Sequence, residues 1–350
     1  MAKFGVSAAG TPKSDELLTS LSVVYTPSSW QQALAAAQWS PAALAERLSL
    51  PNTFIDEMTA GTKQFPIRAT ESYLQRIEIG NTEDPLLLQV LPSHQEMELR
   101  EEYSKDPVGD HAAQRPGGLL QKYHGRALLI TTPACAIHCR YCFRRHYPYE
   151  HHHFQFNQQE AIEWLQSDHS IHEVILSGGD PLMLNDQRLQ VLLNALDAIP
   201  HIQTIRFHTR LPVVLPSRIT ESLLEILQPL SSQLVVVTHS NHSNELNREV
   251  AESIHKLKTI GITLLNQSVL LKRINNDAET LKTLSHRLFE IGVLPYYLHL
   301  LDKVEGSHHF NVEEPEALQL MKTLRSQLPG YLVPRLVREI EGEPNKSPIG

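Results

Sequence analysis

The stretch Arg126-Ala-Leu-Leu-Ile-Thr-Thr-Pro-Ala-Cys135-Ala-Ile-His-Cys139-Arg-Tyr-Cys142 joins a short apolar run to a tight group of cysteines. These three cysteines are the only ones in the 350 residues of the chain, and they follow a C-x3-C-x2-C spacing. Thiolates are the usual protein ligands of a [4Fe–4S] cluster. Because three thiolates leave one of the four irons without a protein ligand, the spacing predicts a cluster with one open coordination site.

Two other uses of cysteine fit this pattern less well. A zinc site completed by His138 or His146 is one alternative, but structural zinc sites usually combine two paired knuckles, and no second pair of cysteines follows here. A disulfide framework is the other. The cysteine count is odd, and a chain of this length can build a core without covalent cross-links. We therefore favour the iron–sulfur cluster.

The cysteine spacing resembles that of the radical S-adenosylmethionine enzymes. In that class the open iron binds S-adenosylmethionine through its amino and carboxylate groups. The resemblance implies that an electron from the cluster cleaves the sulfonium C–S bond, and that the resulting 5′-deoxyadenosyl radical abstracts hydrogen from the substrate. It thus implies two cofactors, a [4Fe–4S] cluster at Cys135, Cys139 and Cys142, and S-adenosylmethionine.

The composition is that of an ordinary globular protein, with 41% hydrophobic and 20% charged residues. The formal net charge of −8 argues against a basic nucleic-acid-binding surface, so we expect no nucleic-acid partner. No apolar run reaches transmembrane length, and residues 1–20 lack the apolar core of a signal peptide. Together with an oxygen-sensitive cluster, these features predict a cytoplasmic protein without a membrane partner.

Residues 1–110 are expected to form a mostly helical N-terminal region that caps the rest of the chain. Ser29 and the alanine-rich run after it combine N-cap chemistry with strong helix formers. Pro41 suits the first turn of a second helix, and Thr53–Met58 and Ile67–Ile79 continue the helical pattern.

From Arg126 onward, short aliphatic runs alternate with amphipathic stretches. The expected strands are Ala127–Thr131, Glu173–Leu176, Thr204–Phe207, Leu234–Thr238, Thr263–Leu265 and Tyr296–Leu300. The expected helices are Gln158–Gln166, Gln187–Ile199, Thr220–Leu227, Asn247–Thr259, Ala278–Ile291 and Glu316–Gln327. This alternation is typical of a parallel sheet with helical crossovers.

Six such units are too few for a closed eight-stranded barrel, and they predict an open (β/α)6 partial barrel, an α/β fold, over residues 111–335. Residues 336–350 would then form a C-terminal tail. Polar residues follow every expected strand. They are the three cysteines, Ser177-Gly178-Gly179-Asp180, His208, Arg210, His239, Asn241, Asn266, Gln267 and Asp302. Because the loops at the carboxyl ends of parallel strands collect the chemistry of such folds, this ring predicts an active site.

Two groups near the cysteines have the chemistry of ligand-binding sites. The glycines of Ser177-Gly178-Gly179-Asp180-Pro181 let backbone groups approach a ligand closely, although the same loop can be a tight turn in which Asp180 caps a helix. Arg140, Arg144 and Arg145 flank the cysteines and suit bidentate capture of a carboxylate, such as that of an amino acid.

Two lysine-containing segments are candidates for cofactor binding. Lys122-Tyr123-His124-Gly125-Arg126 precedes the first expected strand and offers phosphate-binding groups, with ordinary surface polarity as the alternative. Lys346 lies in the turn-rich segment Gly342–Pro348. A lysine held in a tight loop can bond covalently to a carbonyl cofactor, whereas most lysines in such tails are simply exposed.

The order and spacing of several motifs resemble the lysine 2,3-aminomutase family of radical enzymes. The matching motifs are C-x3-CRYCFRR, SGGDPL, TRLPVVLPSRI, THSNHSNE, NQSVLL, YYLHLLD and a terminal Lys-Ser-Pro. The segments YCFRRHYPY and LVPRLVREIEGEPNKSP are similar, more narrowly, to family members that supply β-lysine for modifying translation elongation factor P. The resemblance implies an isomerase that converts L-lysine to β-lysine, with pyridoxal phosphate as a third cofactor.

The family resemblance also assigns residues. Lys346 would bond covalently to pyridoxal phosphate and is the expected catalytic residue. The phosphate of that cofactor would be held by Lys122, Tyr123 and Arg126. Arg144 would pair with the substrate carboxylate, and Asp302 and Glu339 with its distal ammonium. The S-adenosylmethionine pocket would be lined by Gly178, Gly179, Asp180, His239 and Gln267.

The chain departs from the larger family members at three points. Glu-Pro-Asn replaces the glycine-rich run before Lys346. Lys122 stands where larger members have arginine, and the two are not equivalent at a bidentate site. No cysteine remains for the zinc-binding, oligomerising extension of the larger members. We therefore expect neither zinc nor that mode of assembly.

Two alternative functions remain open at this point. A family member acting on another amino acid, such as glutamate, is one, but a carboxylate at Asp302 favours a distal ammonium. A non-enzymatic iron–sulfur carrier or sensor is the other, although carriers normally use four protein ligands. The partners implied are L-lysine, an electron donor such as flavodoxin or ferredoxin, and a ligase that acts on elongation factor P.

Overall fold

The structure is a computed structural model that describes residues 29–63, 65–150, 152–154 and 158–350. The expectation that residues 1–20 carry no signal peptide concerns residues outside these ranges. Among the described residues, no helix combines the length and the apolar character needed to cross a membrane.

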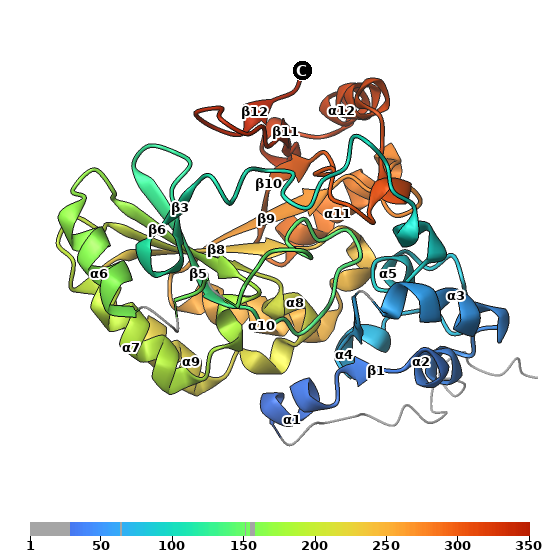
Figure 1. Ribbon diagram of the computed structural model, residues 1–350, viewed down its shortest axis with the longest axis horizontal. Coiled ribbons are helices and arrows are strands. Elements are labelled where there is room, and N and C mark those ends of the chain that lie inside the picture. The colour runs from blue at the N-terminus through green and yellow to red at the C-terminus, as the bar shows by residue number, and fades with distance from the viewer. Residues whose placement is uncertain (1–28, 64, 151, 155–157) are drawn as a thin grey trace, which may run out of the picture.

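A curved sheet with a parallel centre organises the protein (Figure 1). Within the described residues it contains ten strands, in the order β12-β11-β10-β9-β8-β7-β6-β5-β4-β3. Seven neighbours are parallel: β5 (Arg126–Thr132), β6 (Glu173–Gly178), β7 (Thr204–Thr209), β8 (Gln233–His239), β9 (Thr263–Val269), β10 (Leu294–His299) and β11 (Arg335–Arg338). The first six are the predicted strands, so the α/β fold class with an open, parallel sheet is confirmed.

The seventh parallel strand, β11, was not expected from the sequence. β11 spans the boundary between residues 335 and 336, at which the sequence analysis ended the partial barrel and began the tail. The proposed division of the chain into three parts stays a prediction. β12 (Ser347–Pro348) returns antiparallel to β11, with Ser347 opposite Arg338. This hairpin brings Lys346 beside Glu339 at the carboxyl end of β11.

The opposite edge of the sheet is also antiparallel. There β3 (Gln114–Arg115) pairs with β4 (Leu119–Leu120), and β4 pairs with β5. A single turn of 3-10 helix, η2 (Pro116–Gly118), joins β3 to β4.

Helices connect the parallel strands and cover the outer face of the sheet (Figure 1). They are α6 (Gln158–Ser167), α7 (Asp186–Asp197), α9 (Glu221–Leu227), α10 (Arg248–Thr259), α11 (Ala278–Glu290) and α12 (Glu314–Gln327), as predicted to within two residues. Four of them begin at a side chain that accepts a hydrogen bond from a first-turn backbone N–H: Asn185, Thr220, Asn247 and Asp277. Shorter helices lie in the loops: η3 (Pro181–Met183), α8 (Leu211–Val214), η4 (Pro216–Arg218), η5 (Ser243–Glu245), η6 (His308–Phe310) and η7 (Gly330–Leu332).

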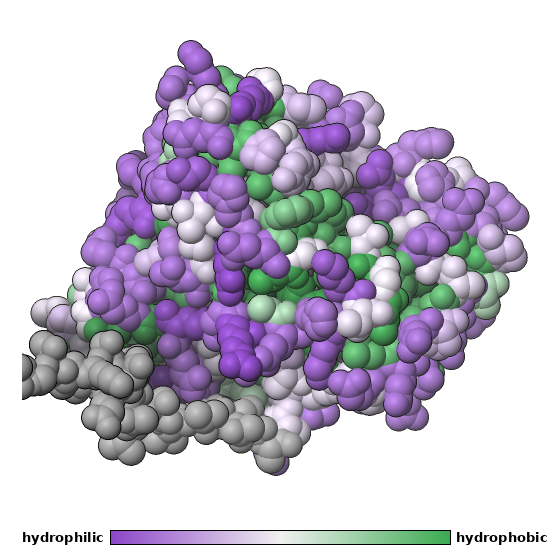
Figure 2. Space-filling model, turned by 180° about the vertical axis from the view of Figure 1, so that it is seen from behind, coloured by the Kyte–Doolittle hydropathy of each residue, from purple (hydrophilic) through white to green (hydrophobic). Residues whose placement is uncertain are grey.

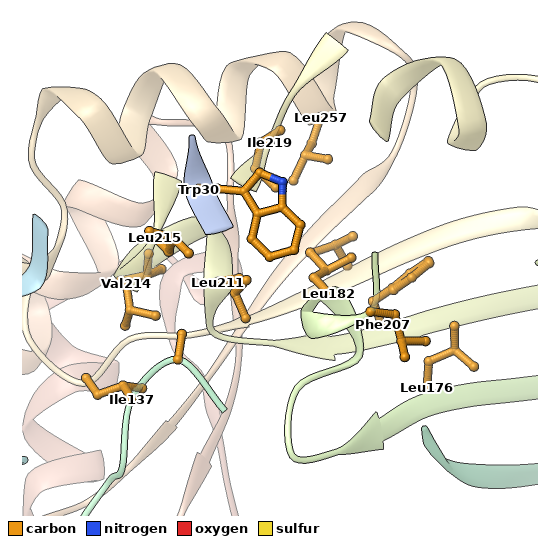
Figure 3. Packing of buried hydrophobic residues seen from close by; sticks show 14 of the residues in the cluster. Trp30, Ile137, Leu176, Leu182, Phe207, Leu211, Val214, Leu215, Ile219 and Leu257 are labelled. Carbon is orange, nitrogen blue, oxygen red and sulfur yellow. The ribbon is translucent and has the colours of Figure 1, made fainter. Parts of the chain in front are cut away.

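The two faces of the sheet differ in chemistry. Successive side chains of a strand point to opposite faces. On the outer face, Leu176 of β6 and Phe207 of β7 are neighbours and are buried among apolar side chains that include Leu182 (Figure 3). On the inner face, the strands carry polar, half-buried residues such as His208 and Gln267. The apolar outer face is therefore buried in the core, and the concave inner face carries polar groups.

Five short helices of the N-terminal region lie on one side of the sheet: α1 (Trp30–Ala35), α2 (Pro41–Leu48), α3 (Thr53–Thr62), α4 (Glu71–Leu74) and α5 (Pro85–Leu88). Ser29 caps α1 and Pro41 occupies the first turn of α2, as predicted. The helix expected over Ile67–Ile79 is wrong at both ends, because the α-helix within that range, α4, spans only Glu71–Leu74. Residues 67 and 68 form β2 (Ile67–Arg68), which pairs with β1 (Gln38–Trp39), and α4 starts only after the cap residue Thr70.

Hydrogen bonds fix the N-terminal region to the loop that carries the cysteines. The backbone N–H of His138 donates to the carbonyl of Arg68, and that of Arg140 donates to the carbonyl of Gln89, each at 2.9 Å. The N-terminal region therefore covers the cysteine loop, and the loop has protein on both sides.

The face opposite that of Figure 1 is mostly hydrophilic (Figure 2). Hydrophobic residues reach this surface mainly in its middle, bordered by hydrophilic ones. The large apolar residues exposed on the molecule include Leu99, and also Phe289 and Tyr331, whose ring centroids lie 5.3 Å apart. Single exposed apolar residues are ordinary on protein surfaces.

Replacing Phe207 with alanine should lower the free energy of unfolding by about 3–5 kcal/mol, because the residue is 1% exposed and its removal leaves a cavity in the core. Denaturant unfolding followed by circular dichroism measures this loss. Leu99→Ala is the control, since Leu99 is 82% exposed and its replacement should cost about 0.5 kcal/mol or less. Equal losses in the two variants would contradict the assignment of the core.

Candidate active site

The three cysteines lie in the irregular loop that follows β5, between Thr132 and the next helix. All three are partly buried, and the backbone N–H of Cys142 donates to the carbonyl of Cys139 at 3.0 Å. Burial, together with the charge of neighbouring thiolates, raises the pKa of Cys135 well above its usual value and that of Cys142 to about 11. Thiols in this setting ionise only when a positive charge joins them, as the irons of a cluster do. The loop therefore fits an iron–sulfur cluster.

The two histidines of the zinc alternative each contact a backbone carbonyl. The ring of His138 stacks on Phe65 with centroids 4.6 Å apart, and its Nδ1 lies 2.9 Å from the carbonyl oxygen of Pro66. The Nε2 atom of His146 lies 3.3 Å from the carbonyl oxygen of Glu305. One ring nitrogen of each histidine is thus bound to a backbone carbonyl, and the cysteine spacing remains the ground for favouring a cluster over zinc.

The glycine loop at the end of β6 supports the cysteine loop. Gly178 has a φ of 114°, a conformation that favours glycine. A Cβ on Gly179 would lie 2.3 Å from the carbonyl oxygen of Ala134, directly before Cys135. The backbone N–H of Gly179 donates to Thr132 at 2.7 Å, and that of Asp180 donates to Ala134 at 2.8 Å. Glycine is therefore required here for close packing between two loops.

Asp180 uses its side chain inside the protein. Its Oδ1 accepts a hydrogen bond from the Thr209 hydroxyl and its Oδ2 accepts one from the backbone N–H of Arg210, both at 2.7 Å. Oδ1 also accepts from the N–H of Leu182, which makes Asp180 the cap of η3. Of the two roles that the sequence left open for Asp180, the capping role is the one these contacts describe.

The three arginines beside the cysteines have different partners. Arg140 donates from Nε and NH2 to the carboxylate of Glu96, and Arg145 donates to the same carboxylate at 2.6 Å. Glu96 lies in the short helix η1 (His94–Met97) of the N-terminal region and was not singled out from the sequence. Only Arg144 turns towards the inner face of the sheet, where its Nε donates to Asp110 at 2.8 Å and its NH1 donates to the Ser177 hydroxyl at 3.2 Å.

A buried polar network lies behind Cys139. Arg210 NH1 lies 2.7 Å from the Cys139 Sγ and 2.9 Å from the Tyr141 hydroxyl. Arg210 NH2 donates to Gln89 at 2.7 Å and to Glu245 at 2.8 Å. The sequence marked Arg210 only as one of the polar loop residues, because its partners come from distant segments with no shared pattern.

His239 and Gln267 lie side by side at the ends of β8 and β9. The Nε2 atom of His239 lies 3.1 Å from the Tyr141 hydroxyl, which connects this pair to the network behind Cys139. Burial lowers the pKa of His239 to about 3, so the imidazole is neutral at physiological pH. A neutral histidine and an amide next to the cluster loop suit a polar, uncharged part of a ligand.

A second group of charges gathers residues from both ends of the chain. Lys122 Nζ lies 2.6 Å from Asp110 Oδ1 and 2.8 Å from Glu339 Oε1. Lys346 pairs with the other oxygen of Glu339. Burial opposes ionisation of Glu339, but the Lys346 and Lys122 ammonium groups outweigh burial and hold its pKa well below the usual range. We call these four residues and Arg144 the charged group.

Asp302 adjoins the charged group and makes no ion pair with any of the described residues. Its Oδ1 is buried without a hydrogen-bond partner. Burial, and then the charge of Glu339, raises the pKa of Asp302 to about 7. The Tyr123 hydroxyl is likewise buried beside Glu339 without a well-formed hydrogen bond, and the Arg126 guanidinium lies 5.6 Å from the centre of the Tyr123 ring.

The half-buried His208 and the buried His299 connect the charged group with His239. Burial and the nearby charges of Lys346 and other cations lower the pKa of His208 and of His299 well below the usual value, so both are neutral. The sequence predicted His208 as a loop residue but did not predict His299, which lies at the end of β10 within an aromatic run. The cysteine loop, the pair His239 and Gln267, and the charged group thus border one inner face of the sheet.

A cysteine triad after the first parallel strand, a glycine loop after the second and polar groups at the later strand ends define a radical S-adenosylmethionine enzyme. The family model described as "Radical SAM superfamily" matches residues 129–284. Enzymes of this class use a [4Fe–4S] cluster and S-adenosylmethionine.

Similarity to characterised proteins extends over nearly the whole chain. It is 46% identical over 326 residues to the L-lysine 2,3-aminomutase of Haemophilus influenzae, covering 93% of this chain and 96% of that protein. It is also 46% identical over 330 residues to the L-lysine 2,3-aminomutase of Escherichia coli, with the same coverage. The chain therefore belongs to the L-lysine 2,3-aminomutase family of radical enzymes, which are isomerases.

Substituting Gly179 by alanine should displace the cysteine loop, because the new Cβ would lie 2.3 Å from a backbone oxygen that cannot move alone. We expect the variant to lose most of its iron and sulfide after anaerobic reconstitution, as measured by chemical analysis and visible absorbance. Gly330→Ala is the control, since nothing lies within 4 Å of a Cβ at that position. A full cluster in Gly179→Ala would show that the close approach is not required.

Proposed function

We propose that this protein converts L-lysine to β-lysine by 2,3-amino migration, with pyridoxal phosphate as well as the cluster and S-adenosylmethionine. The observation that carries the proposal is the position of Asp302. It is a buried carboxyl without an ionic partner, beside a group that also contains Arg144 and Lys346. A site with a guanidinium, an amino group and an unpaired carboxyl is complementary to an amino acid whose side chain ends in a cation.

The residues near Lys346 fit pyridoxal phosphate. The Tyr123 hydroxyl is buried without a well-formed hydrogen bond, and Arg126 makes no ion pair within the described part of the chain, so both are available to a phosphate. Lys122 would add a third phosphate-binding group, and Lys346 would bond to the cofactor. When bound, pyridoxal phosphate supplies a conjugated ring that stabilises an unpaired electron next to the migrating nitrogen.

Arg144 is the best placed of the three loop arginines to bind the substrate carboxylate. Asp110 holds its Nε at 2.8 Å, which fixes the plane of the guanidinium. The remaining N–H groups on the other edge can form a bidentate pair with a carboxylate. Arg140 and Arg145 both pair with Glu96, which compensates one of their two positive charges and holds both side chains away from the inner face.

Asp302 would bind the distal ammonium of lysine, with Glu339 as a second acid nearby. An ammonium brought into this buried region loses its hydration, and a carboxylate beside it restores much of that loss. The same carboxylate would repel the second carboxylate of glutamate, so lysine is favoured as the substrate. Glu339 pairs with Lys346 and Lys122, and it also holds the reactive amino group in place.

The residues on the cluster side would bind the radical source. Cys135, Cys139 and Cys142 would ligate the cluster, while His239 and Gln267 would line the S-adenosylmethionine pocket. Gly178, Gly179 and Asp180 would contribute by holding that pocket's wall against the cysteine loop. The inner face of the sheet, closed behind by the N-terminal region, would keep water and oxygen from the radical.

The wider role that we propose rests on the resemblance of the cysteine and C-terminal segments to aminomutases that serve elongation factor P. The product would pass to a ligase that attaches β-lysine to translation elongation factor P. The electron would come from a low-potential donor such as flavodoxin or ferredoxin. We propose that this takes place in the cytoplasm.

The direct test is anaerobic reconstitution with iron, sulfide and pyridoxal phosphate, followed by incubation with L-lysine, S-adenosylmethionine and dithionite. We expect β-lysine, detected by mass spectrometry after derivatisation, and no product when any one of the three cysteines is alanine. Parallel incubations with glutamate are expected to give none. Cleavage of S-adenosylmethionine without β-lysine would leave the radical class intact and refute lysine as the substrate.

Lys346→Ala should abolish covalent attachment of pyridoxal phosphate while leaving the cluster in place, because the two sites come from different segments of the chain. Borohydride treatment of the loaded protein should fix the cofactor on a peptide that contains Lys346, as mapped by mass spectrometry. Lys303→Ala, at an exposed lysine paired with Glu102, serves as the control and should be labelled normally. A label on any other lysine would refute the placement.

Asp302→Asn should lower kcat/KM for L-lysine by a factor that corresponds to about 2–5 kcal/mol, the usual loss when one partner of a buried charged pair is removed. Iron content and pyridoxal phosphate binding should not change. Asp56→Asn, at an exposed acid, is the control. Turnover at the wild-type rate in Asp302→Asn would shift the distal-end assignment to Glu339.

The same carboxyl predicts a pH dependence. Because the pKa of Asp302 is raised to about 7, its carboxyl is protonated below that pH and cannot pair with an ammonium. We expect kcat/KM for lysine to rise with pH through about 7, since this ratio reports the ionisation of the free enzyme. Asp302→Asn should lack this rise. A rise of equal size in both proteins would assign the ionisation to another group.

A further inference from the structure

Arg210 has an unusual position among the arginines of the cluster region. It follows β7, more than sixty residues after the cysteines, yet its NH1 lies 2.7 Å from the Sγ of Cys139. The side chain is buried. Neither the sequence motifs nor the proposed binding roles account for a guanidinium on a cluster ligand.

The guanidinium is held in place from three directions. Tyr141 accepts from NH1 at 2.9 Å, and Gln89 and Glu245 accept from NH2 at 2.7 and 2.8 Å. The backbone N–H of Arg210 is bound to Asp180 at 2.7 Å, so the main chain is fixed as well. A side chain with this many partners has little freedom to turn away from the sulfur.

The charge of Arg210 is only partly compensated. Glu245 is its ion-pair partner, and that carboxylate also accepts hydrogen bonds from the backbone N–H groups of Asn241 and His242. Those bonds draw part of its negative charge away from Arg210. The nearer acceptor for NH1 is the cysteine sulfur, which carries negative charge whenever it ligates iron.

We propose that Arg210 is a positioning residue that sets the reduction potential of the cluster, by donating a charged hydrogen bond from NH1 to the Cys139 sulfur. Reduction adds one electron, from a low-potential donor, and converts [4Fe–4S]2+ to [4Fe–4S]+. The added negative charge is shared with the ligand sulfurs. A fixed N–H donor and a buried positive charge at one sulfur stabilise the reduced state and raise the potential.

This inference rests on a cluster at Cys135, Cys139 and Cys142, and not on lysine as the substrate. Its readout is the potential of the cluster, measured without substrate turnover. A wild-type protein that assembles no cluster would overturn the radical-enzyme proposal and this one together. A wild-type cluster whose potential does not depend on Arg210 would overturn this one alone.

The test compares Arg210→Gln with Arg218→Gln. Both arginines are buried and ion-paired, but Arg218 pairs with Asp186 and donates to backbone carbonyls, away from the cysteines. Each reconstituted holoprotein is titrated with dithionite under argon, and the reduced cluster is quantified by electron paramagnetic resonance. We expect Arg210→Gln to hold about tenfold less reduced cluster at a given potential, a shift of about 59 mV to lower potential for one electron. Arg218→Gln should match the wild type.

Arg210→Lys keeps the charge and one donor, so it should restore part of the lost potential. That partial rescue separates the hydrogen bond from a general loss of stability, which would lower cluster content without moving the potential. Arg210→Gln with a full cluster and a wild-type potential would overturn the proposal.

A second measurement uses only the wild-type protein, so it does not depend on whether a variant folds. Wild-type protein is made with arginine labelled with 15N only in the guanidinium, and the reduced cluster is examined by pulsed electron paramagnetic resonance. A guanidinium hydrogen-bonded to a ligand sulfur should give a 15N coupling to the unpaired electron. Absence of that coupling in the wild type would overturn the proposal, whatever the behaviour of the variants.

Discussion

Buried carboxylates that each bind cations from distant segments hold this site together. Glu96 joins Arg140 and Arg145, Asp110 joins Arg144 and Lys122, and Glu339 joins Lys122 and Lys346; Glu245 holds Arg210. Charges removed from water are tolerated only when they are paired, and removing one partner of such a pair costs about 3–5 kcal/mol. The pairing therefore constrains the cysteine loop, the loops after β7 and β8 and the C-terminal hairpin at once. If one of these loops moved away, a buried charge would lose its ion-pair partner.

These ion pairs explain why the N-terminal region and the C-terminal hairpin belong to the active site. Glu96 comes from η1, before the first strand of the sheet, and pairs with two arginines of the cysteine loop. Glu339 and Lys346 come from the last residues of the chain, and they meet Lys122 at the other edge of the parallel strands. The sheet supplies a rigid, curved frame. The N-terminal region and the C-terminal hairpin, which lie outside the six predicted strand–helix units, supply the charged residues that form ion pairs across this frame.

The sequence was informative where a pattern is local and repeated. The strands β5 to β10 and their helices were predicted because apolar runs recur at a regular interval, and the cysteine motif is contiguous. β11 was missed because its four residues, with arginine at both ends, do not look like a buried strand. Glu96 and Asp110 were missed for another reason. Each is an acid in an irregular connector, and its partners are 44 and 34 residues away in the chain, so no local pattern marks it.

Asp302 differs from the other acids of the site, because no cation pairs with it among the described residues and its Oδ1 is buried without a hydrogen-bond partner. Burial with no cation bound to it raises its pKa to about 7, against 3.8 for an ordinary aspartate. The folded protein then binds a proton between these values that the unfolded chain has released, so this group lowers stability as pH rises from about 4 to 7. A fold that satisfies its other buried acids of the site with cations or, for Asp180, with hydrogen bonds would not retain such a cost without compensation. In the function proposed above, a ligand that brings its own ammonium would supply the missing partner, and the free energy stored in the unpaired carboxyl would then favour binding of a substrate with a distal cation over one without.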